Sequence, residues 1–281
     1  MTENIFRVES LDDARVALYT EYNEPQLLHY NEPNGGIFIA ETPMVIARAM
    51  ELGMRPVSML VEQGALAAEA MQQILSAVPE ETTVLTAELP VINKITGFTL
   101  TRGVLAAFER PKLPAPADIL RSAECVAVME NVVNPTNLGA IFRSAAALGV
   151  DAILITRGST DPYYRRASRV SMGTVFQIPW TYFPEEGNYV DTLHEAGFTV
   201  ISMALVDRAI PLTDPVLKTV GRRAIVFGTE GTGICGETLA ASDYIAIIPM
   251  QRGVDSLNVA ASSAVAFWEL CSKTTGGENN V

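Results

Sequence analysis

The sequence predicts an α/β protein with a C-terminal domain built on a parallel sheet and a smaller α/β domain before it. Segments with the apolar pattern of strands alternate with helical segments along most of the 281 residues, and this alternation is typical of a parallel sheet covered on both faces. Three prolines fall within Glu109–Pro116, which suits an extended connector. We therefore expect an N-terminal domain over 1–110, a linker over 111–122 and a C-terminal domain over 123–273.

The N-terminal domain contains one helix with clear start signals. Thr42 and Pro43 suit the N-cap and first helical position. One helical face carries the apolar residues Val45, Ile46, Ala49 and Leu52. After this helix the patterns predict a strand over 56–61, a helix over 66–75 and strands over 82–85 and 103–108.

The C-terminal domain alternates more regularly. We expect strands over 125–129, 152–155, 198–203, 224–227 and 244–249, and helices over 137–148, 189–196 and 256–271. Ligands of such sheets bind beyond the carboxyl ends of the strands, and the polar, glycine-rich segments of this chain lie there.

Composition limits the function classes. An apolar fraction of 48% with 19% charged residues is typical of a soluble globular protein. No apolar run reaches the roughly 18 residues of a membrane span, and the N-terminus carries acids where a signal peptide carries bases, so we expect a cytoplasmic protein without membrane contact. The net charge of −12 argues against general electrostatic attraction to nucleic acid, and any such contact must be local.

One basic cluster could supply a local contact. Tyr163–Arg169 holds three arginines within five positions, next to two tyrosines. Two interpretations remain open: a solvated loop, or an RNA-facing patch in which Arg165 and Arg166 bind phosphate and the tyrosines stack on bases.

Cysteine and histidine offer little chemistry. Cys125, Cys235 and Cys271 are odd in number, far apart and without a C-x-x-C pair, so they predict neither a disulfide nor a zinc site and resemble small buried hydrophobic residues. The two histidines, His29 and His194, are expected to be solvated or packed. We expect no metal.

Gly231–Gly236 spells the G-x-G-x-x-G pattern of a nicotinamide-binding turn. That site also needs a full helix after the last glycine and an acidic residue about 20 positions further on. Only about one helical turn follows before Ser242, and position 256 is a serine. An oxidoreductase is therefore the weakest of the alternatives.

Three strand ends carry residues that packing does not explain. The first leads to Asn137 and Arg143, and an arginine in a helix rich in Ala and Leu needs an anionic partner or solvent. The second places Glu230 between glycines, as a cap for local amides or as a functional group. The third leads through Pro249 to Ser256, which also suits a plain helix N-cap.

Together these segments resemble the three signature motifs of the SpoU family of RNA ribose methyltransferases, within the SPOUT group. The first motif is matched by Asn137, Gly139 and Arg143; the second by Gly228, Glu230, Gly231 and Gly233; the third by Ile248, Pro249, Met250, Gly253, Ser256, Leu257 and Asn258. The resemblance extends over 123–270, including the segment Ser171-Met172-Gly173. The N-terminal domain is similar to the accessory substrate-recognition domain of the family.

The resemblance implies a deep trefoil knot in the C-terminal domain and a homodimer that packs through the first-motif and last helices. It implies S-adenosylmethionine as cofactor, bound by Gly228, Ile248, Gly253 and Leu257. The catalytic residues that it implies are Asn137, Arg143, Glu230, Ser256 and Asn258.

The implied reaction is methyl transfer to a ribose 2′-hydroxyl of structured RNA, with ribosomal RNA preferred to tRNA because the accessory domain is present. A guanidinium with a pKa above about 12 is not a base at neutral pH. We therefore expect Arg143 to bind a phosphate beside the target, and this phosphate, or water held by it, to take the proton. A methyltransferase acting on an RNA base and an inactive RNA-binding homologue are the alternatives.

Overall fold

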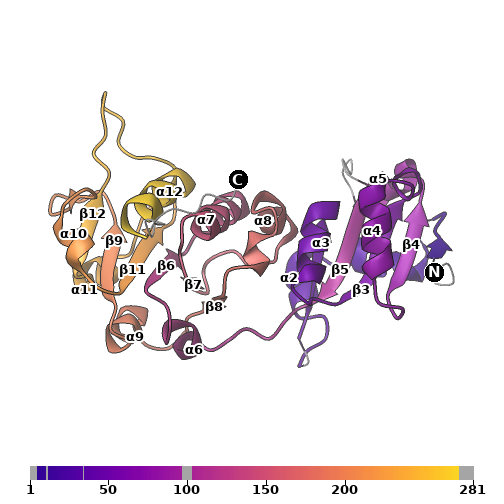
Figure 1. Cartoon of the computed structure of the whole chain (residues 1–281), viewed down its shortest axis with the longest axis horizontal. Coiled ribbons are helices and arrows are strands. Elements are labelled where there is room, and N and C mark those ends of the chain that lie inside the picture. The colour runs from indigo at the N-terminus through magenta and orange to yellow at the C-terminus, as the bar shows by residue number, and fades with distance from the viewer. Residues whose placement is uncertain (1–4, 11, 34, 97–102, 272–281) are drawn as a thin grey trace, which may run out of the picture. The chain divides into compact units, whose positions relative to one another are not determined.

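The computed structural model describes residues 5–10, 12–33, 35–96 and 103–271, and the chain forms two compact units (Figure 1). Unit 1 comprises Met1–Lys112 together with Tyr163–Phe176, and unit 2 comprises Leu113–Pro162 and Gln177–Val281. The sequence had assigned Tyr163–Phe176 to the C-terminal domain. The contacts of this segment instead group it with the N-terminal unit.

Unit 1 contains a mixed sheet in the order β1-β4-β3-β5-β2. Its strands are β1 (Ile5–Arg7), β2 (Ile37–Glu41), β3 (Pro56–Glu62), β4 (Thr83–Ala87) and β5 (Val104–Glu109). Strands β1, β3 and β4 are parallel to one another, whereas β5 is antiparallel to both β3 and β2. The three predicted strands are confirmed, and β1 and β2 were not predicted.

The helices of unit 1 include the one with clear start signals. They are η1 (Ala14–Val16), α1 (Ala17–Thr20), α2 (Glu24–Leu28), α3 (Pro43–Glu51), η2 (Gln63–Ala65), α4 (Glu69–Ala77), α5 (Leu89–Thr96), α8 (Arg165–Val170) and η3 (Thr174–Phe176). The Thr42 hydroxyl accepts from the Val45 amide at 3.4 Å, and Pro43 stands at the first helical position, which confirms the predicted start of α3.

Aromatic packing and an ion pair are among the contacts that hold the inserted segment in unit 1. Phe38 of β2 has its ring centroid 5.0 Å from Tyr163 and 5.4 Å from Phe176. Arg169 Nη1 lies 3.2 Å from a carboxylate oxygen of Glu41, whose side chain is only 2% exposed. These partners lie more than 120 positions apart in sequence, so no local pattern indicates them.

Unit 2 contains a seven-stranded sheet in the order β10-β12-β9-β11-β6-β7-β8. Its strands are β6 (Cys125–Glu130), β7 (Ala152–Ile155), β8 (Trp180–Tyr182), β9 (Thr199–Met203), β10 (Ile210–Pro211), β11 (Arg223–Gly228) and β12 (Tyr244–Ile247). All neighbouring pairs are parallel, which confirms the predicted sheet type. The edge strands β8 and β10 were not predicted, because two or three residues give no periodic signal.

Helices cover both faces of this sheet (Figure 1), with α7 and α12 on one side and α6 and α9 on the other. Their bounds are α6 (Pro116–Leu120), α7 (Pro135–Ala147), α9 (Tyr189–Glu195), α10 (Val216–Thr219), α11 (Gly236–Ala241) and α12 (Val259–Leu270). Val226 of β11 packs in the core with residues of α6 and α9. The next residue, Phe227, faces α12, where its ring centroid lies 5.4 Å from that of Phe267. This alternation is the period of two that a strand buried on both faces requires.

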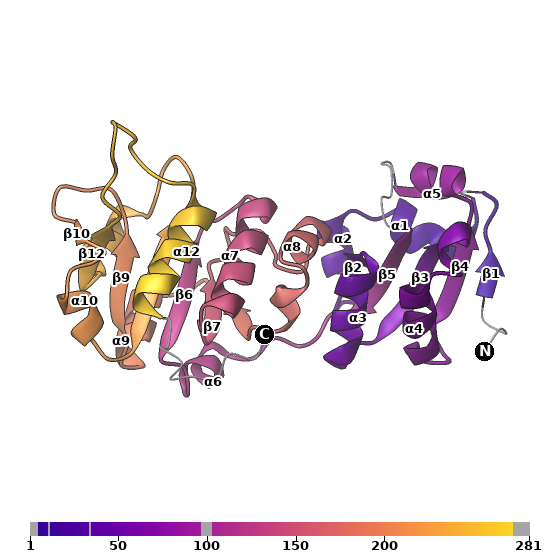
Figure 2. The ribbon, with the colours of Figure 1, turned by 45° about the horizontal axis from the view of Figure 1, so that its top comes forward.

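Two helix predictions need correction. The segment expected to be an extended linker contains α6, and its Ile119 and Leu120 are buried in the core of unit 2. The last helix begins at Val259, and Asn258, not Ser256, is its N-cap: the Asn258 side chain accepts from the Ala260 amide at 2.9 Å. Figure 2 shows α7 and α12 side by side along the same face of the sheet.

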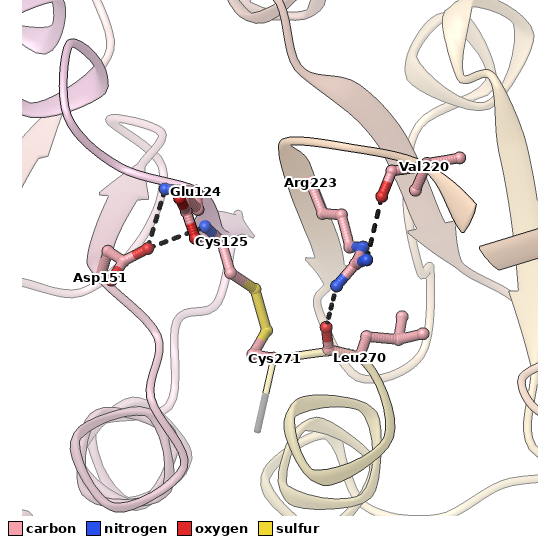
Figure 3. Close-up of a disulfide and its surroundings, with 7 residues drawn as sticks. All are labelled: Glu124, Cys125, Asp151, Val220, Arg223, Leu270 and Cys271. Atoms are coloured by element: carbon pink, nitrogen blue, oxygen red, sulfur yellow. Dashed lines mark hydrogen bonds between the residues drawn. A yellow bond between two sulfur atoms is a disulfide. The ribbon is translucent and has the colours of Figure 1, made fainter. Parts of the chain in front are cut away.

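The cysteine prediction is wrong on two counts. Cys125, at the start of β6, and Cys271, just after α12, form a disulfide across 146 positions (Figure 3). A sequence separation of this size carries no pairing signal, and only the return of α12 across β6 brings the two sulfurs together. The third cysteine, Cys235, is exposed and unpaired instead of buried.

The same corner of unit 2 is held by polar contacts (Figure 3). Asp151 accepts from the backbone amides of Glu124 and Cys125 at 2.8 and 2.9 Å, and the Arg223 guanidinium donates to the carbonyls of Val220 and Leu270. The end of α12 is therefore fixed to the sheet by a covalent bond and by hydrogen bonds. Among the described residues no helix combines the length and apolar character needed to cross a bilayer.

Candidate functional site

A cavity of about 610 Å³ opens at the carboxyl ends of β9, β11 and β12 in unit 2. Three loops line most of it: 203–206 after β9, 228–234 after β11 and 248–258 after β12, the last in part. The carboxyl edge of the parallel sheet is where the sequence predicted ligand binding. The second and third motifs both contribute to these walls.

Most of the predicted site residues line this cavity. Gly228, Ile248 and Leu257, expected at the cofactor, are among its wall residues, as are Glu230, Ser256 and Asn258, expected in catalysis. Gly253, also expected at the cofactor, is not a wall residue and stands in the exposed part of the third loop with φ +72°.

Glycine is required at Gly228 because the loop folds back against it. A Cβ at this position would lie 2.3 Å from the backbone carbon of Gly233 and 2.5 Å from the Ile234 nitrogen. Gly231 and Gly233 have φ values of +98° and +71°, which favour glycine, and the Gly233 amide closes the turn on the Thr229 carbonyl at 3.1 Å. The glycines thus form a tight reversal at the cavity wall, followed only by the six-residue α11.

Three predicted catalytic residues form one hydrogen-bonded chain. The Asn258 side-chain amide donates to Asn137 Oδ1 at 3.1 Å and also to Glu230 Oε1. Asn137 is 8% exposed at the start of α7, whereas Glu230 is exposed on the second-motif loop. The amide of Asn258 therefore ties together all three motif loops at the edge of the cavity.

The remaining predicted residues lie elsewhere. Arg143 is exposed on α7 and does not line the cavity. Arg165 and Arg166 belong to α8 in unit 1, where Glu24 accepts from the Arg165 backbone amide and Arg166 is exposed. The third arginine of that cluster, Arg169, is engaged with the buried Glu41.

Two features of the site were not predicted from the sequence. Residues 203–206 form the third wall of the cavity. All four are apolar, so the sequence gives no sign that they belong to a functional site. Glu130, the last residue of β6, is only 3% exposed and accepts from the Cys235 amide, the Thr238 hydroxyl and the Tyr189 hydroxyl. The sequence feature that could have indicated Glu130 is a carboxylate directly after the apolar run 125–129.

The buried Glu130 carboxylate affects the pKa of Tyr189. Burial, followed by the hydrogen bond donated to Glu130, raises the pKa of Tyr189 above its ordinary value. The histidines lie outside the cavity; His194 Nε2 is 3.0 Å from Asp243 Oδ2. Over the ranges that the structure describes, no group of three His, Cys, Asp or Glu side chains is arranged to hold a metal ion.

The known proteins that this chain resembles are named as RNA methyltransferases. The family model described as the SpoU rRNA Methylase family matches residues 124–268, just over half of the 281 residues. An uncharacterised tRNA/rRNA methyltransferase from Mycobacterium tuberculosis is 42% identical over 184 residues, which make up 65% of this chain and 64% of that relative. The match thus spans less than two thirds of the mycobacterial protein.

Two further matches extend over more of the chain. A 23S rRNA (guanosine-2′-O-)-methyltransferase from Acinetobacter baylyi is 28% identical over 218 residues, covering 74% of this chain and 86% of the relative. The AdoMet-bound structure of an rRNA methyltransferase from Sinorhizobium meliloti shares the fold, with a TM-score of 0.77 at 23% identity over 95% of this chain and 97% of its own. The match of the family model over more than half of the chain establishes that the protein belongs to the SpoU rRNA Methylase family.

Proposed function

We propose that this protein transfers a methyl group from S-adenosylmethionine to a ribose 2′-hydroxyl of ribosomal RNA. The observation that carries the proposal is the cavity, where the second and third motif loops meet and Asn258 links them to the first. The family match and relatives named as 23S rRNA 2′-O-methyltransferases support the reaction and the RNA class.

The walls of the cavity fit the cofactor. Its volume of about 610 Å³ lies within the roughly 300 to 1,000 Å³ typical of small-molecule sites. Leu205, Ile248 and Leu257 offer apolar surface for an adenine ring, and Glu230 and Asp255 place carboxylates where a cationic ligand is favoured. When bound, S-adenosylmethionine supplies an electrophilic methyl group on a sulfonium.

The protein's task is to hold the ribose in line and to remove its proton. In the transfer the 2′-oxygen forms a bond to the methyl carbon as the carbon–sulfur bond breaks, and the hydroxyl proton leaves. Asn137, Glu230 and Asn258 are already joined by hydrogen bonds, so their polar groups are preorganised beside the cavity. We assign to them, with Ser256, the positioning of the ribose.

Arg143 binds the RNA phosphate beside the target ribose in this proposal. It is exposed and outside the cavity of its own chain, so it acts through bound RNA and not on the cofactor. The guanidinium stays protonated at neutral pH, and the phosphate that it holds, or water on that phosphate, accepts the proton.

Unit 1 serves as the substrate-recognition domain, with Arg165 and Arg166 of α8 directed to RNA phosphate. The proposal includes a cytoplasmic site of action, where ribosomal RNA is found. It also includes a trefoil knot in unit 2, one of the rare exceptions to unthreaded topology, and a homodimer through α7 and α12. In support of the dimer, Trp268 and Val265 of α12 are 66% and 41% exposed.

The decisive experiment is transfer of labelled methyl from S-adenosylmethionine to separated ribosomal RNA and tRNA fractions, followed by alkaline digestion. Because 2′-O-methylation blocks alkaline cleavage, an alkali-resistant labelled dinucleotide from ribosomal RNA is the expected product. Label in an alkali-released nucleotide would mean methylation of a base. Cofactor binding without transfer to either RNA would favour the inactive homologue and overturn the proposal.

A further inference from the structure

We propose that Glu130 is a positioning residue that anchors the glycine loop of the cofactor cavity, the segment 228–234. The identity of the ligand that this loop receives rests on the proposed function. Glu130 is the last residue of β6, and in the parallel register of the sheet it lies beside Gly228, where the loop begins. It is not a wall residue of the cavity, so its effect on a ligand has to pass through the loop.

Both carboxylate oxygens of Glu130 are occupied by donors from distant elements. Oε1 accepts from the Cys235 backbone amide at 2.6 Å, at the end of the loop. Oε2 accepts from the Thr238 hydroxyl of α11 at 2.6 Å and from the Tyr189 hydroxyl of α9 at 2.5 Å. A carboxylate that is 3% exposed is costly to bury unless such donors satisfy it.

This arrangement fixes the two ends of the loop through one residue. The upstream end is paired beside Glu130 in the sheet, and the downstream end donates its amide to the same side chain. Between the two ends, Gly231 and Gly233 have positive φ values. Glycine also adopts many other backbone conformations, so a loop with released ends would sample them. Glu230, which accepts from Asn258, stands in this span.

The carboxylate is therefore expected to preorganise the cavity wall and the Glu230 side chain, in addition to stabilising unit 2. Preorganisation lowers the ordering cost of ligand binding. A role in stability alone would change the unfolding temperature and leave ligand affinity unchanged. The two roles can be separated because one of the three donors, the Tyr189 hydroxyl, comes from a helix that does not line the cavity.

Three variants separate the effect of Glu130 on ligand affinity from its effect on stability. Glu130→Gln keeps an oxygen that can accept from the Cys235 amide, and its amide nitrogen faces hydroxyls that can turn to accept. Glu130→Met has a similar length and no such acceptor. Tyr189→Phe is the matched control, since it deletes a hydrogen bond to the same carboxylate without releasing the loop.

The measurement is the Kd of S-adenosylmethionine by calorimetry, below the unfolding temperature of every variant. We expect Glu130→Met to weaken binding at least about 10-fold, Glu130→Gln to stay within about 3-fold of wild type, and Tyr189→Phe to leave Kd unchanged despite a lower Tm. In turnover, Glu130→Met should raise KM for the cofactor more than KM for RNA. Equal affinity in Glu130→Met and wild type, or losses that follow Tm in all three variants, would refute the inference.

Hydrogen exchange tests the anchor in the wild-type protein even where Glu130→Met does not fold. The Cys235 amide should exchange at least about 100-fold more slowly than the amides of Gly231 and Thr232 in the same exposed segment. Equal exchange rates would overturn the anchor. Wild-type protein that shows the protected amide but binds no S-adenosylmethionine would refute the proposed function and leave the anchor standing.

Discussion

At the scale of single residues, Asn258 has two separable tasks. Its Oδ1 caps α12 by accepting from the Ala260 amide, and its Nδ2 donates to Asn137 and Glu230 at the cavity. An aspartate can perform the first task and not the second, because a carboxylate accepts from amides but donates to no carboxylate at neutral pH.

Asn258→Asp should therefore retain the helix cap and lose activity. The cap, whose loss costs about 1 kcal/mol, is preserved, while the new charge repels Glu230 and removes the donor. We expect methyl transfer to fall by about 10²- to 10³-fold, the effect of losing a preorganised contact to the reacting groups. Asn258→Ala should lose both activity and about 1 kcal/mol in urea unfolding. An Asn258→Asp enzyme with near-normal kcat would contradict the assignment.

The buried tyrosines predict a pH dependence. Burial is the main cause that raises the pKa of Tyr19 and of Tyr189, and the bond from Tyr189 to Glu130 raises it further. Both phenols should stay protonated in the native state at the pH where ordinary tyrosines ionise, near pH 10. Since the folded pKa exceeds the unfolded one, this stability is complete below about pH 10 and is lost as pH rises above it.

Absorbance at 295 nm checks this prediction. All eight tyrosines should titrate in guanidinium chloride, whereas in the native protein Tyr19 and Tyr189 should resist titration near pH 10. Tyr189→Phe should reduce the number of resistant groups by one. Ionisation of every native tyrosine near pH 10 would contradict the buried environment.

At the scale of elements, the disulfide is the covalent constraint at the end of α12. It joins the residue after this helix to the first residue of β6 across 146 positions, and closing a loop of that size stabilises a fold by up to about 5 kcal/mol in the chain-entropy model. We expect dithiothreitol to lower the Tm of unit 2. The Cys125→Ala, Cys271→Ala double variant should have a low Tm that does not respond to the reductant; equal sensitivity in both proteins would contradict the pairing.

Helix α8 offers a second matched pair of variants. Arg169→Ala removes the guanidinium that lies 3.2 Å from the buried Glu41 carboxylate. Because Arg169 is itself 45% exposed, this loss should cost about 1 to 3 kcal/mol in urea unfolding of unit 1. Arg166→Ala removes an exposed guanidinium that the proposed function directs to RNA phosphate. It should weaken RNA binding and reduce the slope of log K against log salt by about 1. Equal RNA affinity in Arg166→Ala and wild type would remove this residue from the interface.

At the scale of the whole molecule, the net charge of −12 means that the proposed contact with RNA has to be local. The exposed apolar side chains of α12 support the proposed homodimer. Trp268 and Val265 are exposed on α12, which also pairs with α7 inside the chain. A second copy covering this face would bury a large aromatic side chain, the kind of residue that dominates interface energies.

Light scattering after gel filtration tests the dimer. Wild type should have twice the 30.3 kDa chain mass, and Trp268→Glu should have the mass of one chain. Leu52→Glu, at a 46% exposed apolar position in unit 1, is the control that should remain dimeric. A monomeric wild type would refute the dimer without affecting the cavity.

The sequence alone predicted the parallel sheet and most of its strands, because a strand buried on both faces consists of a continuous apolar run, as in 125–129. It also placed the polar, glycine-rich segments at the carboxyl edge of the sheet, where ligands bind, and the resemblance to the SpoU motifs assigned Gly228, Glu230 and Asn258 to one site. The backbone reversal at Gly228 leaves no space for a side chain. A local requirement of this kind fixes the residue type and can therefore be recognised from the sequence.

Tertiary structure alone decided the rest, since the partners are far apart in sequence. The Cys125–Cys271 disulfide, the burial of Glu41 against Arg169 and the three donors on Glu130 join positions separated by between 59 and 146 residues. Neither periodicity nor composition specifies such pairs. They arise when the sheet order brings one strand end beside another, and at Glu130 that juxtaposition turns an ordinary carboxylate into the anchor of a ligand loop.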